Sequence, residues 1–416
     1  MSLVLSNPGS IWIIHPYAGG PGVGRYDRPY HLAKCWQERG EKCVVITCSD
    51  HHLLDQRCHP GPTVIQGVLY EFLKSFEYQG NGVRRLLNMA AFTAAIILRS
   101  GSLARRYGRP SRIIISSPHP YAYLAGEYLR KRFSAKLIFE VRDLWPLSLV
   151  ELAGVSPSHP LVRFTDWLER RAYRTADQVV SLLPCTKPHM LERGLSEKRW
   201  HYIPNGILNL DSENSIVDNA AIRLVRQWRE EGKFVLAYTG ALGRPNHVQS
   251  LIAALAIQAR KDSNVYAVIV GRGDLKADII SLIENRNLAH RVAVFDQIPK
   301  KEVICLLNDV DAGFISLRPE PIFRFGISPN KLFDYMLLEL PVVFAVTSGN
   351  DPVSEAGCGS TADPRDPEDI SRAIDSLANL SIEERQKLGA RGKDWVIRNH
   401  SYDVLAENYI KLMGVK

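Results

Sequence analysis

The sequence is poor in the patterns that mark several common classes of protein. Its seven cysteines are scattered, odd in number and without a Cys-x-x-Cys pair, which argues against a zinc site and a disulfide framework. Free thiols fit a reducing compartment. The segment from Met1 to Ser10 lacks the basic and then apolar pattern of a secretory leader, and no uncharged apolar run reaches the roughly 18 residues of a membrane-spanning helix. We therefore expect a cytoplasmic protein, which leaves a location at a membrane surface open.

The common phosphate-binding signatures are missing as well. The segment over residues 15–24, which includes Gly19 and Gly20, follows the first expected strand, but its spacing is not Gly-x-Gly-x-x-Gly and no Gly-Lys-Ser/Thr motif follows. Its glycines allow the backbone to approach a ligand closely, so we interpret it as a substrate-lining loop rather than a dinucleotide site. No cluster of acids has the spacing of a divalent-metal site, and we predict no metal and no other cofactor.

The composition is that of a soluble globular protein, with 45% hydrophobic and 23% charged residues. A chain of 416 residues exceeds the usual size of one hydrophobic core, so two domains of roughly 200 residues each are expected. The net charge of +8 is compatible with a nucleic acid, an anionic membrane or a phosphate-bearing substrate, and by itself does not choose among them.

Short β-type runs alternate with amphipathic segments along most of the chain, which predicts βαβ units and a mostly parallel sheet. A polar stretch over residues 205–219 interrupts the pattern and is interpreted as a hinge. We predict an α/β fold of two Rossmann-like, doubly wound domains that face a central cleft: residues 1–205, to which a C-terminal helix at 400–416 returns, and residues 206–399. Ligands of such sheets bind at the carboxyl ends of the strands, so the cleft is the expected site.

The expected strands are residues 11–14, 43–48, 68–73, 112–117, 136–141, 178–183 and 200–203 in the first domain, and 233–239, 265–270, 292–295, 312–317 and 342–346 in the second. The clearest helical patterns are residues 30–39, 121–133, 161–175, 367–380, 382–398 and 402–413.

The most informative segment, residues 326–346, is typical of a loop, a helix and a strand. A helix that begins just after Ser328 leaves backbone N–H groups unpaired near Asn330 and Lys331 and carries a partial positive charge, so it suits a diphosphate. Asp334 lies one turn further on in an apolar run, where it can accept hydrogen bonds from vicinal ribose hydroxyls. The pair suggests a nucleotide diphosphate. The alternative is an ordinary core helix whose aspartate caps a neighbour or faces solvent.

Other polar residues follow expected strands. Arg244 lies in the turn after the second domain's first strand, next to Gly240, and either binds a diphosphate through paired donors or is a solvated turn residue. His119 follows residues 112–117; a lone histidine usually has a structural role, and its place at the carboxyl edge makes contact with a sugar hydroxyl or a phosphate more frequent than usual. The block Glu140–Pro146 (EVRDLWP) places acids, a base and an indole at a strand end, as a functional cluster or a structural ion pair.

A helical pattern over residues 82–107 combines an apolar body with arginines at its edges. Such a helix can lie in a membrane interface, where each basic residue near an anionic leaflet contributes about 1 kcal/mol. The alternative is a core-packing helix with solvated ends. The arginines are Arg84, Arg85, Arg99, Arg105 and Arg106.

With these residues in view, the chain resembles the retaining, two-domain GT-B glycosyltransferases of family 4. More narrowly, it resembles the bacterial members that build O-antigen, capsule or exopolysaccharide on a lipid carrier, including N-acetylfucosamine-type transferases. The likeness covers nearly the whole chain, and its specific motifs are EVRDLWP at Glu140–Pro146 and SPNKLFDYM at Ser328–Met336. It is similar also in less specific motifs such as IPNGI at Ile203–Ile207 and VIVGRGD at Val268–Asp274.

The resemblance implies a metal-independent retaining hexosyltransferase that moves a sugar from a nucleotide-diphosphate sugar, a UDP-sugar by preference, to a polyprenyl-diphosphate-linked sugar. It implies a peripheral location at the inner face of the plasma membrane, on anionic lipid, and no nucleic-acid partner. It also implies front-side attack by the acceptor hydroxyl without a protein nucleophile, so that catalysis rests on positive potential around the leaving diphosphate.

The resemblance assigns roles to particular residues. In the catalytic step it implies His119, Arg244 and Lys331. For acceptor or sugar contact it implies Tyr17, His119, Arg142, Asp143 and Trp145. For donor binding it implies Gly19, Gly20, Gly240, Arg244, Gly271, Ser328, Asn330, Lys331, Leu332 and Asp334.

Two departures from the family pattern stand out. The family carries two acids separated by seven residues; the second falls on Asp334, but the first falls on Gly326, so the donor sugar cannot be carried over. The family's basic pair falls on Ala241 and Asn246, which leaves Arg244 as the nearest cation in that turn.

Two other functions remain open at this point. A nucleotide-sugar epimerase of GT-B-like shape would need acids placed for proton transfer, and the EVRDLWP block is the one candidate. A catalytically silent nucleotide-sugar-binding protein is supported by the glycine at position 326. Product analysis with donor and lipid-linked acceptor distinguishes the three.

Overall fold

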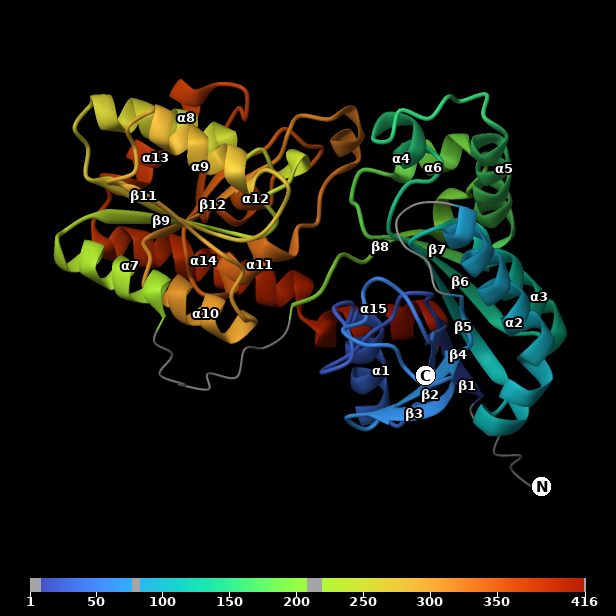
Figure 1. Ribbon diagram of the computed structural model, residues 1–416. Helices are drawn as coiled ribbons and strands as arrows, with labels where there is room; N and C mark the ends of the chain where they lie inside the picture. The colour runs from blue at the N-terminus through green and yellow to red at the C-terminus, as the bar shows by residue number, and fades with distance from the viewer. Residues whose placement is uncertain (1–8, 77–82, 208–218, 415–416) are drawn as a thin grey trace. The chain divides into compact units, whose positions relative to one another are not determined.

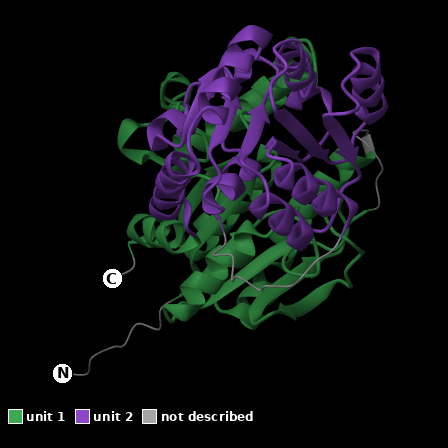
Figure 2. Ribbon diagram, turned by 90° about the vertical axis from the view of Figure 1, so that its left-hand side faces the viewer, with its two compact units in different colours: residues 1–206, 402–416 green, residues 207–401 purple. Residues whose placement is uncertain are grey.

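The computed structural model describes residues 9–76, 83–207 and 219–414. These residues form two compact units, one made of residues 1–206 together with 402–416 and the other of residues 207–401 (Figure 2). The boundary predicted between residues 205 and 206 differs from this division by one residue. Most of the predicted hinge, residues 208–218, lies outside the described residues.

Unit 1 is built on an eight-stranded sheet with the strand order β3-β4-β2-β1-β5-β6-β7-β8 (Figure 1). All neighbouring strands are parallel except the edge pair β3 and β4, which is antiparallel. The strands are β1 (Ser10–Ile14), β2 (Cys43–Cys48), β3 (Gly61–Ile65), β4 (Val68–Leu73), β5 (Pro110–Ser117), β6 (Lys136–Val141), β7 (Gln178–Ser181) and β8 (Trp200–Tyr202).

Helices cover both faces of this sheet because its central strands are apolar on both sides. On one face, α1 (Arg28–Glu38) and α15 (Tyr402–Met413) pack on alternate residues of the strands, with the ring centroids of Trp36 and Tyr409 5.7 Å apart. The other face carries α2 (Val83–Tyr107), α3 (Tyr123–Phe133) and α5 (Pro160–Thr175) (Figure 1). The remaining helical segments are η1 (Pro120–Ala122), α4 (Leu147–Glu151), α6 (Lys187–Glu192) and η2 (Glu197–Arg199).

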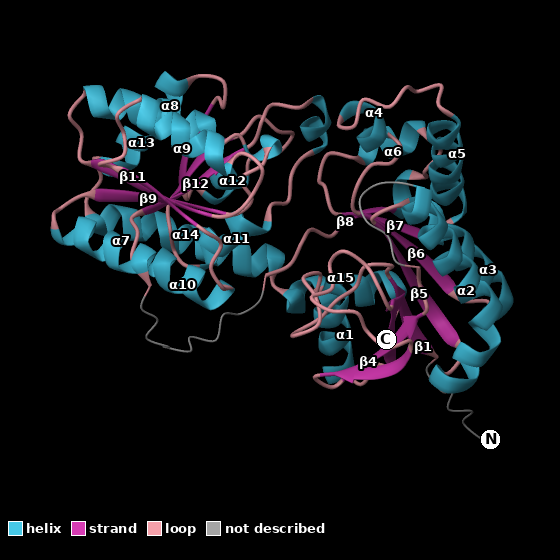
Figure 3. Ribbon diagram, viewed as in Figure 1, coloured by secondary structure: helices cyan, strands magenta, loops and turns pink. Residues whose placement is uncertain are grey.

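Unit 2 has a six-stranded parallel sheet with the order β11-β10-β9-β12-β13-β14, and helices again cover both faces (Figure 3). Its strands are β9 (Phe234–Thr239), β10 (Val265–Val270), β11 (Val292–Phe295), β12 (Ala312–Ser316), β13 (Val342–Ala345) and β14 (Gly359–Ala362). One face carries α7 (Ala220–Glu230), α10 (Lys300–Asn308), α11 (Asn330–Leu337), α12 (Pro352–Ala356) and α14 (Ile382–His400). The other carries α8 (Gln249–Arg260), α9 (Lys276–Asn285) and α13 (Pro367–Ala378), and η3 (Arg244–Asn246) and η4 (Pro321–Phe325) are short turns.

A buried carboxylate ties the C-terminal helix to the sheet of unit 1. Glu140, on β6, accepts hydrogen bonds from Arg28 Nε at 3.0 Å, from Ser116 Oγ at 2.6 Å and from the hydroxyl of Tyr409. Burial alone would raise the pKa of Glu140. The charge of Arg28 and the hydrogen bonds from Ser116 and Tyr409 lower it by more, so the pKa lies below its usual range. Arg28 also donates to the carbonyl of Pro204 at 2.6 Å. The acid that opens the EVRDLWP block is therefore a structural anchor.

The sequence patterns missed two strands and placed several element ends a few residues away. β3 is an exposed edge strand, and β14 consists of small residues, so neither carries an apolar run. The hairpin turn between β3 and β4 uses positive φ angles at Gln66 and Gly67. The described part of α2 begins at Val83, and Gly82, where the helical pattern was expected to begin, lies outside the described residues.

Candidate functional site

In unit 2, two glycine turns at the carboxyl ends of β9 and β10 pack directly against each other. Gly240 N donates to the carbonyl of Val270 at 2.9 Å, and Leu242 N donates to that of Arg272 at 2.8 Å. A Cβ atom on Gly271 would lie 1.8 Å from the carbonyl oxygen of Gly240, so no other residue fits there. The turns bring Gly240 and Gly271 to one edge of the sheet, where parallel α/β sheets bind their ligands.

The loop before α11 is fixed by a side chain that the sequence patterns did not single out. The side-chain amide of Asn350 accepts from Ile327 N at 2.7 Å and donates to Ile327 O at 3.2 Å. Gly326 has φ +95°, a conformation that residues with a side chain rarely adopt. The glycine at the position of the family's first acid is thus required by this loop, and an acid there would strain it.

Lys331, in the first turn of α11, reaches back across the glycine turn of β9. Its ammonium donates to Tyr238 OH at 2.8 Å and to Asn246 Oδ1 at 3.0 Å, and it lies 4.3 Å from the centroid of the Tyr238 ring. Burial lowers the pKa of Lys331 to about 8. The family pattern has a basic residue at position 246. Here that residue is Asn246, which carries no charge and instead accepts a hydrogen bond from the ammonium of Lys331.

The start of α11 is anchored to β9 below this cation. Tyr335 OH accepts from Thr239 N at 2.9 Å and lies 3.1 Å from Thr239 Oγ1. Pro329 occupies the N-cap position without a side-chain capping hydrogen bond. A helix start of this kind presents N–H groups and a partial positive charge close to the ammonium of Lys331. The arrangement favours a bound anion.

Asp334 lies one turn into α11 and is half-buried. It forms an ion pair with Lys300, the first residue of α10. Burial raises the pKa of Asp334 above its usual value, and Lys300 opposes this effect. Asp334 thus neither caps a neighbouring helix nor stands alone in solvent, and contact with ribose hydroxyls stays a prediction. The sequence patterns did not indicate Lys300, because a basic residue at a helix start is ordinarily a solvated one.

The other predicted donor residues differ in how they are placed. Arg244 is exposed at the start of η3, and within the described part of the chain its side chain has no ion pair or hydrogen bond. Leu332 is fully buried in the apolar core and its N–H donates to the carbonyl of Pro329, so its side chain cannot contact a donor. Asn330 is exposed at the first position of α11, and Ser328 is half-buried just before it.

In unit 1, the predicted acceptor residues gather where β1 and β5 end. The rings of Tyr17 and His119 lie 5.6 Å apart, and the guanidinium of Arg85 lies 5.7 Å from the centroid of the Tyr17 ring. His119 is 1% exposed, and neither of its ring nitrogens has a hydrogen-bond partner among the described residues. Burial, together with the charge of Arg85, lowers the pKa of His119 to about 3. The neutral imidazole has unpaired polar atoms but is enclosed, and its contact with a ligand hydroxyl stays a prediction.

The remaining residues of EVRDLWP split into two groups. The guanidinium of Arg142 stacks 3.8 Å from the centroid of the Tyr26 ring and lies 3.3 Å from Nε2 of His15, so this arginine is held by the fold. Asp143 is exposed. Trp145 is half-buried, and its indole N–H has no partner within the described ranges. Contact of these three with an acceptor stays a prediction.

Gly19 and Gly20 lie in a buried loop that the fold itself holds. The N–H of Gly19 donates to the carbonyl of Tyr26 at 2.7 Å, and its carbonyl accepts from Tyr70 OH at 2.7 Å. Gly20 accepts from the N–H of Gly24 at 3.1 Å. These contacts account for the shape of the loop without a ligand, so a donor contact from either glycine stays a prediction.

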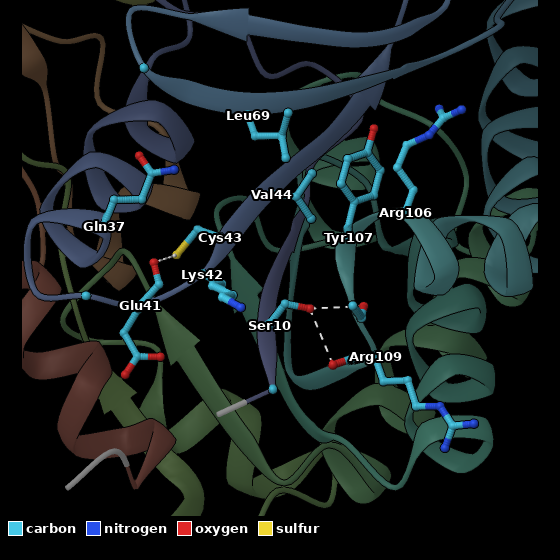
Figure 4. A pocket seen from close by; sticks show the side chains of 14 residues that line it. Ser10, Gln37, Glu41, Lys42, Cys43, Val44, Leu69, Arg106, Tyr107 and Arg109 are labelled. Atoms are coloured by element: carbon cyan, nitrogen blue, oxygen red, sulfur yellow. Dashed lines mark hydrogen bonds between the residues drawn. The ribbon is translucent and has the colours of Figure 1, made fainter. Parts of the chain in front are cut away.

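The large pocket of about 910 Å³ in unit 1 lies at the other edge of the sheet (Figure 4). Ser10 and Cys43, the first residues of β1 and β2, line it together with Arg109, which precedes β5. Figure 4 shows Ser10 Oγ bonded to the carbonyls of Gly108 and Arg109. Because strands begin here, this is the amino edge, whereas ligands of parallel sheets bind at the carboxyl edge. None of the predicted site residues lines it.

Comparison with known families finds one match for each unit. The chain matches the glycosyl transferase 4-like domain over residues 22–206 and the glycosyl transferases group 1 domain over residues 223–395. The chain therefore belongs to the GT-B glycosyltransferases, with one domain of each kind, and the predicted fold of two Rossmann-like α/β domains is confirmed.

Individual relatives are distant. The probable glycosyltransferase WbjE of Pseudomonas aeruginosa is 23% identical over 339 residues, which cover 80% of this chain and 82% of WbjE. The structure of sucrose-phosphate synthase from Thermosynechococcus elongatus has a TM-score of 0.69 at 18% identity, over 98% of this chain and 100% of that one. HepE of Anabaena, in complex with UDP and glucose, has a TM-score of 0.64 at 16% identity, over 98% and 100%.

Proposed function

We propose that this protein is a retaining glycosyltransferase that moves a hexose from a UDP-sugar to a lipid-linked saccharide in bacterial surface polysaccharide synthesis. The donor part of the proposal is supported by HepE, a structural neighbour solved with UDP. The acceptor part is supported by the motifs shared with transferases that act on lipid carriers. The proposed location is the cytoplasmic face of the plasma membrane, where such a carrier presents its sugar.

One observation carries the donor site: the ammonium of Lys331 lies at the start of α11, across the glycine turn of β9. Two of its three N–H donors are used by Tyr238 and Asn246. The third can be directed at a phosphate oxygen, which the helix start and the exposed Arg244 also favour. For Asp334, one turn further on, we propose a hydrogen bond accepted from a ribose hydroxyl. A nucleoside diphosphate is the ligand class that needs both features.

The chemistry follows from these charges. Breaking the anomeric C–O bond leaves negative charge on the β-phosphate, and positive groups already in place stabilise that charge without reorganisation. Lys331, Arg244 and the N–H groups at the start of α11 supply this potential. A neutral His119 can orient a hydroxyl of the sugar without competing for the phosphate. In the proposed mechanism the acceptor hydroxyl attacks from the side that the diphosphate leaves, and the diphosphate accepts its proton.

The test is product analysis with a panel of UDP-sugars and a prenyl-diphosphate-linked monosaccharide. A disaccharide with the anomeric configuration of the donor supports the proposal. Conversion of the UDP-sugar without acceptor would indicate an epimerase, and UDP binding without any product would indicate a silent binding protein. Transfer should persist in excess EDTA, because the charge of the leaving group is met by protein cations; loss with EDTA and rescue by Mg²⁺ would contradict metal independence.

A further inference from the structure

α2 exposes an apolar face that the described residues of unit 1 leave uncovered. The helix has no charged residue from Leu86 to Leu98, and its two polar side chains there are turned to the protein, with Asn88 donating to Phe76 O and Thr93 to Met89 O. Its length and hydropathy are those of a membrane-spanning helix. However, its other face is buried in unit 1, and residues such as Phe92 and Ile96 are fully enclosed. Contiguous exposed apolar faces mark binding surfaces.

Beside this face lies an apolar groove of about 420 Å³ between α2, η1 and α5. Its α2 wall is formed by Leu86, Ala90, Thr93, Ala94 and Ile97, and the opposite side by Tyr121, Leu124, Leu161 and Phe164. The hydroxyl of Tyr121 is used by Thr165 at 2.9 Å. The lining therefore offers an occupant apolar contact and almost no hydrogen bonds, which suits an aliphatic chain.

The groove adjoins the candidate acceptor residues through a ring contact. The ring of Tyr121 stacks on His119 with centroids 5.4 Å apart, and on Phe164 with centroids 6.1 Å apart. Phe164 stacks in turn on Trp167 at 5.8 Å. Arg85 directly precedes Leu86, which lines the groove, and its guanidinium lies over Tyr17, the other ring beside His119. A cation and a neutral imidazole thus lie next to the apolar groove.

We propose that this groove binds the isoprenoid chain of the lipid-linked acceptor, with the diphosphate of the carrier near Arg85 and the sugar near His119. From His119 and Tyr17, through Arg85, to the groove lined by Leu86, the protein offers polar, cationic and apolar groups in the order of the sugar, diphosphate and hydrocarbon of such a lipid. The inference rests on the proposed function for the identity of the acceptor. It places the isoprenoid chain of the acceptor in a groove within unit 1.

The arginines at the ends of α2 argue for a groove over a purely electrostatic attachment to the membrane. Arg99 donates to Glu71 at 2.7 Å and Arg106 donates to it at 3.2 Å, so two of the five arginines neutralise a buried acid. Arg84 and Arg105 are exposed. Membrane attachment by all five arginines therefore stays a prediction, with two of them already paired with Glu71.

The experiment measures binding of tritiated geranylgeranyl diphosphate to the full-length protein by equilibrium dialysis, below the concentration at which the lipid forms micelles. Ala94→Glu places a charge in the groove at an exposed helix position, where it does not disturb the core. Leu98→Glu is the matched control, on the same helix and 83% exposed, outside the groove lining. We expect Ala94→Glu to weaken binding at least tenfold and Leu98→Glu to change it less than twofold.

Three results would overturn the groove: no binding by the wild type, equal binding by Ala94→Glu, or equal loss in both variants. Equal loss, with sedimentation on phosphatidylglycerol vesicles that both variants abolish, would show that this face docks on the bilayer itself. UDP binding by the same preparations keeps the two proposals apart. Protein that binds UDP but not the prenyl lipid contradicts only the groove, and protein that binds the lipid but not UDP contradicts only the proposed donor site.

Discussion

The two units each place charged residues at the carboxyl end of a parallel sheet, but they use them in different ways. In unit 1, Glu140 is 3% exposed and every contact it makes is with the fold, through Arg28, Ser116 and Tyr409. In unit 2, Lys331 is only partly buried and its two partners leave one donor over. A charge whose bonds are all satisfied by the protein stabilises the fold, whereas one held in place but incompletely bonded can act on a ligand.

The comparison predicts its largest effect in unit 1. Glu140→Gln leaves the buried Arg28 without its counter-charge, and breaking a buried pair in this way costs about 3 to 5 kcal/mol of unfolding free energy. Because the pKa of Glu140 is lowered in the folded state, its contribution is present at neutral pH and is lost as the pH falls below about 4.5, the ordinary value. Denaturant unfolding at pH 7 and pH 4 checks both statements. A loss of activity at unchanged stability would instead assign Glu140 to the site.

The matching change in unit 2 should do the opposite. Lys331→Ala removes a donor to the leaving group, which costs about 2.7 to 4 kcal/mol of transition-state stabilisation, or roughly a hundredfold to a thousandfold in turnover. Stability should change little, because the lysine is desolvated in the folded protein and its removal relieves that cost. Initial rates and melting curves on the same samples separate the two effects. A variant that melts early and retains its rate would place Lys331 with Glu140 as a structural residue.

The sequence predicted the architecture well because the central strands are continuous apolar runs. The ends of β2, β4, β6, β10 and β11 fall where the sequence placed them. Exposed or small-residue strands such as β3 and β14 leave no such signal. The site was harder, since its meaning depends on contacts between segments far apart in the chain. Lys331 was predicted, but its partners Tyr238 and Asn246 lie 93 and 85 residues away, and only the fold shows that they hold it.

A similar limit applies to the charged blocks. EVRDLWP at a strand end and SPNKLFDYM at a helix start both carry charged residues, and the sequence leaves a functional and a structural interpretation of each open. The structural role of Glu140 follows from its hydrogen bonds with Tyr409 and Arg28, which are 269 and 112 residues away in the chain. The glycine at position 326 looked like a lost acid, and its positive φ shows instead a loop that excludes one.

A smaller effect is expected at Asp334. Asp334→Asn removes a charge-assisted acceptor for ribose hydroxyls and should weaken UDP binding by about 1.5 to 3 kcal/mol in calorimetry. Stability should change by less than about 1 kcal/mol, since the ion pair with Lys300 is partly exposed. Lys300→Met is the control, because it breaks the ion pair and keeps the carboxylate. Unchanged UDP affinity in Asp334→Asn, or equal weakening in both variants, would remove Asp334 from the ribose site.

The smallest expected effect is the uptake of a proton when UDP binds. Since the pKa of Lys331 is about 8 in the free protein, the lysine is largely neutral above that pH, and a bound diphosphate should raise its pKa and draw a proton from solution. Calorimetry of UDP binding at pH 8.5, in two buffers of different ionisation enthalpy, should show proton uptake that is absent at pH 6.5. The affinity should fall as the pH rises above 8. Identical heats in the two buffers at pH 8.5 would place Lys331 away from the phosphate.

The central claim is that Lys331 supplies, from α11, the cation that the family pattern carries at position 246. The most direct measurement compares the transfer rate of Lys331→Ala with that of the double variant Lys331→Ala/Asn246→Lys. Because the two side chains meet at 3.0 Å, a lysine at position 246 should return an ammonium to the same place. The account predicts that the double variant transfers the sugar at least tenfold faster than Lys331→Ala. A folded double variant that is no faster than Lys331→Ala would contradict it.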